Sequence, residues 1–175
     1  MNLHPSTRFH PLARLLHWLM AVLILAMLFD GVSMVADLSP RHPWLVSLHK
    51  AIGLALLVLV VLRIATRLRY ATPPLPSDLP RLQQWAAKAS HLLLYGLMLG
   101  MPLIGWGMQS AGGYPLPWQL PAIAPHDLRL YALLRALHGW LAYLLFATVL
   151  VHIAAALVHG FVRRDGVLRS MWPGR

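Results

Sequence analysis

Four long apolar segments constrain the fold of this chain more than any other feature. They cover about residues 12–36, 44–68, 82–109 and 133–162. Each holds roughly 20 or more mostly apolar residues, the length that a helix needs to cross the hydrocarbon core of a bilayer. The pattern predicts an all-α integral membrane protein, built as a four-helix bundle in which residues 1–175 form one transmembrane domain.

The composition narrows the possible chemistry. The sequence contains no cysteine, which excludes disulfides, thiolate-bound zinc, iron–sulfur clusters and haem attached through cysteines. The five acidic residues are all Asp, too few to favour a carboxylate-bridged metal site, whereas the ten histidines remain as metal ligands. The formal net charge of +10 does not indicate nucleic-acid binding, because the positive charges gather at the ends of the apolar segments.

The distribution of Lys and Arg predicts the orientation in the membrane. With the N-terminus inside, eleven of these residues lie on the inner side and four on the outer side. The positive-inside rule therefore places both termini in the cytoplasm. The outer four are Arg41, Lys50, Arg129 and Arg135, and the inner eleven are Arg8, Arg14, Arg63, Arg67, Arg69, Arg81, Lys88, Arg163, Arg164, Arg169 and Arg175.

Two histidines in the last apolar segment indicate a functional site. His138 and His152 are 14 residues apart, which is about 21 Å along a helix axis and close to four turns. Both imidazoles therefore project from nearly the same face. Ionisable residues inside a membrane helix are costly and usually mark function. We interpret this pair as ligands for two cofactors at different depths.

The predicted topology supplies each of these histidines with a partner at the same depth. His49 lies near the outer end of the second segment, like His138, and His17 lies near the inner end of the first, like His152. Two facing imidazoles at one depth suit a six-coordinate haem iron, and a four-helix bundle offers the cavity. The alternative is that these histidines only form hydrogen bonds between helices.

Other histidines compete for the inner position. His91 is about as deep as His17, and His159 follows His152 by two turns. We expect both to lie near the interface or to support a ligand, for example by binding a haem propionate. His4, His10, His42 and His126 lie in tails or loops and are expected to be solvated.

Basic residues are candidate partners for the propionates, because Arg can clamp a carboxylate with two parallel hydrogen bonds. Membrane anchoring is the alternative for most of the inner ones. An outer cluster would also attract a small anion. The inner candidates are Arg14, Arg63 and Arg67, and the outer candidates are Lys50, Arg129 and Arg135.

Three further expectations concern the surroundings of the cofactors. The second nitrogen of each ligating imidazole needs an acceptor, which we expect to be a backbone carbonyl because nearby carboxylates are absent. Gly96 and Gly100 in the third segment either pack against a helix or make room for a porphyrin. The tail after Arg163 is expected to be frayed or interfacial.

Short motifs in a fixed order carry a family resemblance. They are His-Trp at 17–18, Leu-His-Lys at 48–50, Val-Leu-Arg at 61–63, Arg-Leu-Arg-Tyr-Ala-Thr-Pro-Pro at 67–74, Ala-Ser-His at 89–91, Met-Pro-Leu-Ile-Gly at 101–105, Leu-His-Gly-Trp at 137–140 and Val-His-Ile-Ala-Ala-Ala-Leu-Val-His at 151–159. Over nearly its whole length the chain resembles the bacterial cytochrome b561 family of small di-haem membrane cytochromes. The family's axial histidines would correspond to His17, His49, His138 and His152.

The resemblance implies electron transfer through two haem b groups in the bacterial inner membrane, with the ubiquinone pool as one partner. Some members of the family resemble superoxide oxidases, which pass electrons from periplasmic superoxide to ubiquinone. Two other functions stay open. The chain could anchor a partner dehydrogenase or hydrogenase as its cytochrome b subunit, or it could be a haem-free transporter.

Overall fold

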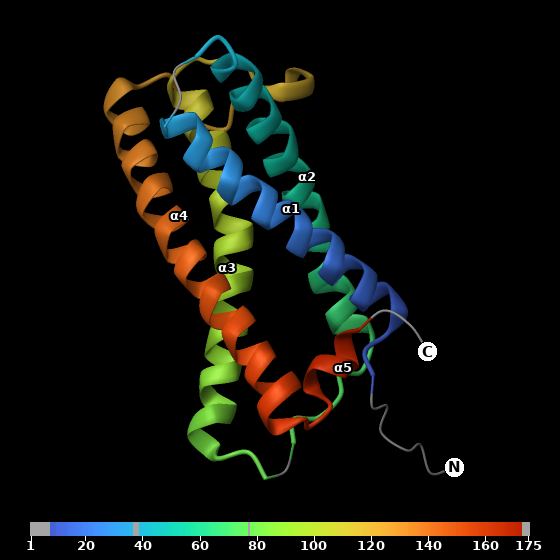
Figure 1. Cartoon of the computed structure of the whole chain (residues 1–175). Helices are drawn as coiled ribbons and strands as arrows, with labels where there is room; N and C mark the ends of the chain where they lie inside the picture. The colour runs from blue at the N-terminus through green and yellow to red at the C-terminus, as the bar shows by residue number, and fades with distance from the viewer. Residues whose placement is uncertain (1–7, 37–38, 77, 173–175) are drawn as a thin grey trace.

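Four long helices dominate the computed structural model, which describes residues 8–36, 39–76 and 78–172. They are α1 (Pro11–Ala36), α2 (His42–Arg69), α3 (Arg81–Ala111) and α4 (Leu128–Leu157), and neighbours in sequence run antiparallel (Figure 1). All four are long and apolar enough to cross a membrane, and the described residues contain no strand. The predicted all-α class with four membrane-compatible helices is confirmed.

Helices α1, α2 and α3 match or extend slightly beyond the predicted segments, and the largest differences are in α4, which ends at Leu157 where η2 continues it. This helix begins at Leu128, about five residues earlier than expected. The carboxylate of Asp127 accepts hydrogen bonds from the N–H groups of Arg129 and Leu130 at 2.7 and 3.0 Å. An Asp at this position caps a helix, so it fixes the start that hydropathy alone placed too late. Within the loop before it lies a short 3₁₀ helix, η1 (Pro117–Gln119).

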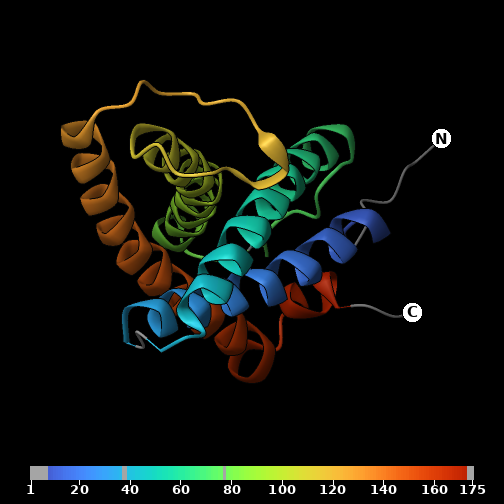
Figure 2. The ribbon, with the colours of Figure 1, turned by 90° about the horizontal axis from the view of Figure 1, so that it is seen from above.

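Two small apolar clusters hold the helices together. Met20 and Ile24 of α1 pack with Leu56 and Val60 of α2, and a second cluster joins α3 to α4 through Leu94, Leu97 and Leu145. Figure 2 shows α1 beside α2. Among the described residues, α1 and α4 make no comparable helix-to-helix contact.

Large apolar side chains cover the outside of the bundle. Phe29, Leu68 and Leu82 are 74%, 84% and 81% exposed. A water-soluble protein rarely exposes such an extended apolar surface. In a bilayer these side chains would contact lipid, so the surface agrees with the membrane assignment.

The end of the chain returns to the start of α1. After α4 the helix continues as a π-helical segment, η2 (Val158–Arg163), and a turn leads into α5 (Val167–Met171). The indole of Trp18 donates to the Met171 carbonyl, and the Arg14 guanidinium donates to the Trp172 carbonyl, both at 2.9 Å. The tail is therefore not frayed up to Trp172, because α1 satisfies its last carbonyls. An interfacial position of the tail stays a prediction.

The two ends of the described chain lie at the same end of the bundle (Figure 1). We name this the inner end and the end that holds the α1–α2 turn the outer end, following the predicted orientation. Which end faces the cytoplasm stays a prediction from the charge distribution.

Candidate functional site

The structure brings His49 and His138 together near the outer end. His49 projects from α2 and His138 from α4, and their ring centroids lie 6.1 Å apart with the planes at 66°. Both side chains are only partly exposed. The outer pair that was predicted from depth is thus a pair of neighbours in space.

Near the inner end the structure brings three imidazoles together. The rings of His17 on α1 and His152 on α4 are 6.2 Å apart with the planes at 71°. His91 on α3 lies 5.6 Å from the same His152 ring. The two histidines of the predicted inner pair are therefore neighbours in space. His91 is a second neighbour of His152.

The ring separations match what a shared metal ion requires. A metal–imidazole bond of about 2 Å on each side, with the ring nitrogens about 1 Å from the centroids, sets the two centroids roughly 6 Å apart. In the described part of the chain, no group of three or more His, Cys or acidic side chains could hold a bare metal ion. Paired imidazoles instead suit haem iron, because the porphyrin supplies the other four ligands.

A buried carboxylate supports the outer pair. Asp30 of α1 places Oδ2 3.1 Å from Nδ1 of His49, and its side chain is only 6% exposed. The expectation that backbone carbonyls would fill this role, because carboxylates were absent nearby, is wrong for His49. An imidazole that donates from Nδ1 to a carboxylate keeps Nε2 free to bind a metal. The signal was available, because Asp30 is an acidic residue inside an apolar segment.

The partner ring, His138, occupies a space that a glycine leaves open. A Cβ atom at Gly105 of α3 would lie 3.4 Å from Cε1 of His138 and 3.7 Å from its Nδ1. Nδ1 is buried and has no hydrogen-bond partner of good geometry among the described residues. The outer site thus combines His49, held by Asp30, with His138, whose ring is not fixed by such a contact, and with Gly105 beside it. These residues fit a haem.

At the inner end, His91 shows the support that was expected of a ligand. Its Nδ1 lies 2.6 Å from the carbonyl of Ala87, one turn back on α3. Donation to this carbonyl leaves Nε2 free. By hydrogen bonding alone, His91 is therefore as well prepared to bind a metal as His49 is.

His17 has a different partner, the buried guanidinium of Arg63. Arg63 donates one hydrogen bond to the Ala13 carbonyl at 2.9 Å and lies 3.2 Å from Nδ1 of His17. Because Arg can only donate, His17 carries its proton on Nε2 in this arrangement. Binding iron through Nε2 requires Nδ1–H, so Arg63 would have to turn to another acceptor, for which a propionate is suited.

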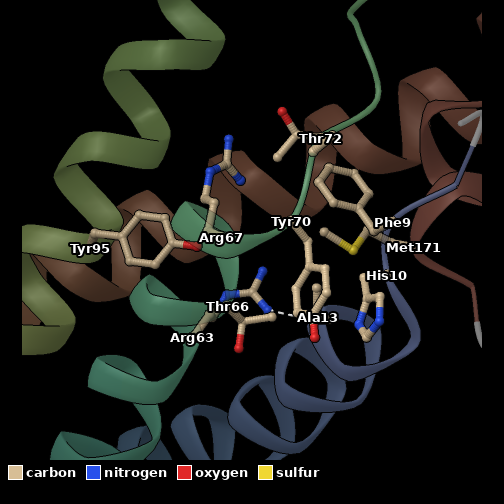
Figure 3. Close-up of a pocket in the computed structure, with 11 residues that line it drawn as sticks. Phe9, His10, Ala13, Arg63, Thr66, Arg67, Tyr70, Thr72, Tyr95 and Met171 are labelled. Atoms are coloured by element: carbon tan, nitrogen blue, oxygen red, sulfur yellow. Dashed lines mark hydrogen bonds between the residues drawn. The ribbon is translucent and has the colours of Figure 1, made fainter. Parts of the chain in front are cut away.

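The other inner cations line or flank the same region. Arg63 and Arg67 line a small pocket with Tyr95, and Figure 3 shows these side chains converging from α2 and α3. Arg67 lies 6.0 Å from the centre of the Tyr95 ring. Arg14, the third propionate candidate, donates to the Trp172 carbonyl. The structure thus places two of the three candidates around one pocket.

The three outer cations are not linked by any contact between described residues. Lys50 donates to the Pro115 carbonyl at 3.1 Å, and Arg135 lines an open hollow on α4 with Trp140. Arg129 is exposed in the first turn of α4. Their common role in attracting an anion stays a prediction.

Two glycines of α3 do not act as predicted for helix packing. A Cβ atom at Gly96 or Gly100 would meet nothing within 4 Å. No described helix therefore packs closely on them, and the packing interpretation is wrong within this chain.

His159 belongs to an ionic network at the inner end. Its Nδ1 lies 2.6 Å from Asp165, and Arg163 contacts Asp165 at 3.1 Å and Asp78 at 2.7 Å. Burial acts to raise the pKa of Asp165, but hydrogen bonds from His159, the Val167 N–H and Arg163 outweigh it, so the pKa lies below its usual range. Sequence reasoning placed His159 near the interface but missed this network, whose members come from three separate segments.

Comparison with known proteins identifies the family. Residues 8–174 match the family model described as prokaryotic cytochrome b561. The chain is 32% identical to "Probable superoxide oxidase CybB" of Yersinia pestis, over 90% of this chain and 92% of that protein. It is also 32% identical to "Cytochrome b561 homolog 2" of Escherichia coli K12, over 94% of this chain and 90% of that protein. The chain belongs to the prokaryotic cytochrome b561 family.

Proposed function

We propose that this protein carries two haem b groups and passes electrons from a donor at its outer end to ubiquinone. Its family makes it a multi-pass bacterial membrane cytochrome b that binds haem and transfers electrons. The observation that carries the proposal is the arrangement of four histidines in two pairs, with ring centroids 6.1 and 6.2 Å apart. In this proposal one domain lies in the inner membrane with both termini in the cytoplasm.

Each pair would hold one haem. His49 and His138 would bind the outer haem, and His17 and His152 the inner one, with Arg63 and Arg67 as propionate partners. When bound, each haem supplies a one-electron Fe(III)/Fe(II) couple. With two imidazoles holding each iron, oxygen would have no free ligand position there, and electron transfer without bond formation would be the favoured chemistry.

Superoxide is the donor that we propose for the outer end. One of the relatives is named a probable superoxide oxidase, and Lys50, Arg129 and Arg135 place positive charge at this end. Two superoxide anions would lose one electron each and leave as two O₂. The two electrons, together with two protons, would convert ubiquinone to ubiquinol. The protein's part is to attract the anion and to hold the redox groups.

The first test is a reduced-minus-oxidised spectrum with haem quantification on the purified protein. We expect two haems per chain. His49→Ala or His138→Ala should remove one haem, and His17→Ala or His152→Ala the other. His126→Ala, in the loop before α4, is the control that should keep both. A purified protein without haem would contradict the proposal.

A second test addresses the attraction of superoxide. We expect Lys50→Gln to slow haem reduction by superoxide several-fold, and added salt to slow the unmodified protein, because exposed charges are screened. Arg81→Gln at the inner end is the matched control. If the rate is indifferent to both Lys50→Gln and ionic strength, electrostatic steering is wrong.

A further inference from the structure

The two histidine pairs differ in the charge that is buried beside them. At the outer pair, the Asp30 carboxylate lies 3.1 Å from His49. At the inner pair, the Arg63 guanidinium lies 3.2 Å from His17. Asp30 and Arg63 are each only 8% exposed. A buried negative charge therefore faces one site and a buried positive charge faces the other.

The other charged side chains near the two pairs do not cancel this contrast. Arg63 interacts electrostatically with all three inner imidazoles, and Arg67 adds a second positive charge beside His91. At the outer pair, Asp30 is the charged side chain that acts on His49. Lys50 directs its ammonium group to the Pro115 carbonyl in the outer loop, and Arg135 lies in an open hollow on α4.

Both charged groups change how readily a ligated iron accepts an electron, through the Asp30–His49 contact at the outer pair and through the nearby charge of Arg63 at the inner pair. A carboxylate that accepts the Nδ1–H of an axial imidazole makes that ligand a stronger electron donor, which stabilises the oxidised iron. A nearby guanidinium attracts the added electron and stabilises the reduced iron. Water screens neither effect well, because both charged groups are buried, and electrostatic interactions are stronger inside a protein than in bulk water.

We propose that Asp30 and Arg63 are positioning residues that give the outer haem the lower reduction potential and the inner haem the higher one, so that electrons run from the outer end to the inner end. This inference rests on the proposed function. The step moves one electron from the outer pair to the inner pair, and no bond forms or breaks. It also implies that the quinone receives its electrons at the inner end.

The order of the two potentials is the first test. The purified protein with both haems is titrated against redox mediators while optical and electron paramagnetic resonance spectra are recorded. His138→Ala and His152→Ala, each lacking one haem, assign the signals to the outer or inner site. We expect the outer haem to have the lower potential. An outer potential equal to or above the inner one overturns the inference.

The second test changes the charge but keeps the shape. Asp30→Asn retains an oxygen that can accept from His49, and we expect it to raise only the outer potential. The equilibrium constant for outer-to-inner transfer should fall at least tenfold, which is about 59 mV for one electron. The resonance signal of the outer ferric haem should shift as well. Asp127→Asn, which removes a carboxylate from the exposed loop at the same end, should change neither potential.

The inner half is tested in the same way. Arg63→Gln should lower only the inner potential, and Arg69→Gln, an exposed change on the same helix, should leave it unaltered. If both Asp30→Asn and Arg63→Gln leave the potentials in place, the inference is wrong although the proposed function stands. Absence of haem from the unmodified protein would contradict both the inference and the proposed function.

The inference can still be tested if Asp30→Asn loses the outer haem. If Asp30→Asn does not retain the outer haem, Asp30→Glu restores the carboxylate on a longer side chain. An outer haem with a low potential in Asp30→Glu supports the inference, whereas an outer potential above the inner one contradicts it.

Discussion

At the scale of single residues, the inner end offers three imidazoles for two axial positions. His152 contacts both His17 and His91, and the His91 ring is the nearer at 5.6 Å. His91 already donates to the Ala87 carbonyl, whereas His17 faces the donor Arg63. The family resemblance favours His17, and these hydrogen bonds favour His91.

We predict that His91→Ala keeps two haems per chain and that His17→Ala keeps one. The physical reason is that α1, which carries His17, packs less closely on α4 than α3 does, so the His17–His152 pair leaves more room for a haem between its helices. Haem quantification on the purified variants decides the matter. Loss of the inner haem in His91→Ala with retention in His17→Ala would reverse the assignment.

The sequence was sufficient to find the histidine pairs. It was insufficient to find the side chains that form hydrogen bonds with them. A helix has a fixed rise per residue, so the positions of His49 and His138 within their segments determined their matching depth. Which side chain of a third helix reaches His49 depends on helix rotation, which the sequence does not specify. Asp30 was therefore missed, although its place inside an apolar segment marked it as unusual.

At the scale of elements, α3 supports the outer pair through Gly105, which has no side chain beside the His138 ring. Gly105 leaves room for the His138 ring, with an added Cβ only 3.4 Å from Cε1, whereas Gly96 on the same helix faces open space. A larger side chain at 105 would compete with the imidazole for space, and the same change at 96 need not displace any atom.

We therefore predict that Gly105→Leu lowers the haem content from two to about one per chain, and that Gly96→Leu leaves it unchanged. Both changes replace a helical glycine with a better helix former, so their effects on helix propensity are similar. Haem quantification together with the ratio of the two ferric resonance signals measures the result. Equal haem loss in both variants would show that Gly105 has no special part in the outer site.

Helix existence was predictable, and so were the ends of α1, α2 and α3 to within about two residues, but the start of α4 was not. Hydropathy located all four segments, because a membrane helix needs about 20 apolar residues whatever its neighbours are. The start of α4 depends on one local hydrogen-bonding group, the Asp127 cap. The short helix α5 carries too few residues to form by itself, and its structure depends on contacts with Trp18 and Arg14 that only the folded bundle provides.

At the scale of the whole molecule, an ionic network closes the inner end. Arg163 links Asp165, just past η2, to Asp78 in the α2–α3 connection, and His159 holds Asp165 from the other side. The network thus ties two connections that are distant in sequence. Its central carboxylate has a pKa below its usual range in the folded protein.

This pKa gives stability a dependence on pH. Because the folded-state pKa of Asp165 is the lower one, its carboxylate stabilises the fold above the unfolded-state value of about 4, and this contribution is lost as the pH falls through the folded-state pKa. We predict that Asp165→Asn lowers the free energy of unfolding at pH 7 by on the order of 1 kcal/mol and weakens the loss of stability at acidic pH. Thermal unfolding in detergent at several pH values measures both effects, with Asp127→Asn as the control. A variant that loses stability in acid as steeply as the unmodified protein would contradict this assignment.

The return of α5 to the start of α1 has a consequence for the order of events during synthesis. Trp18 enters the membrane with the first helix, but its partner Met171 is 153 residues further along the chain. The ribosome must therefore add all of these residues before this contact can close. His17 lies next to Trp18, so the surroundings of the inner pair are completed last, whereas His138 and the segments around the outer pair emerge earlier. We expect the outer site to be ready for its cofactor before the inner one during biogenesis.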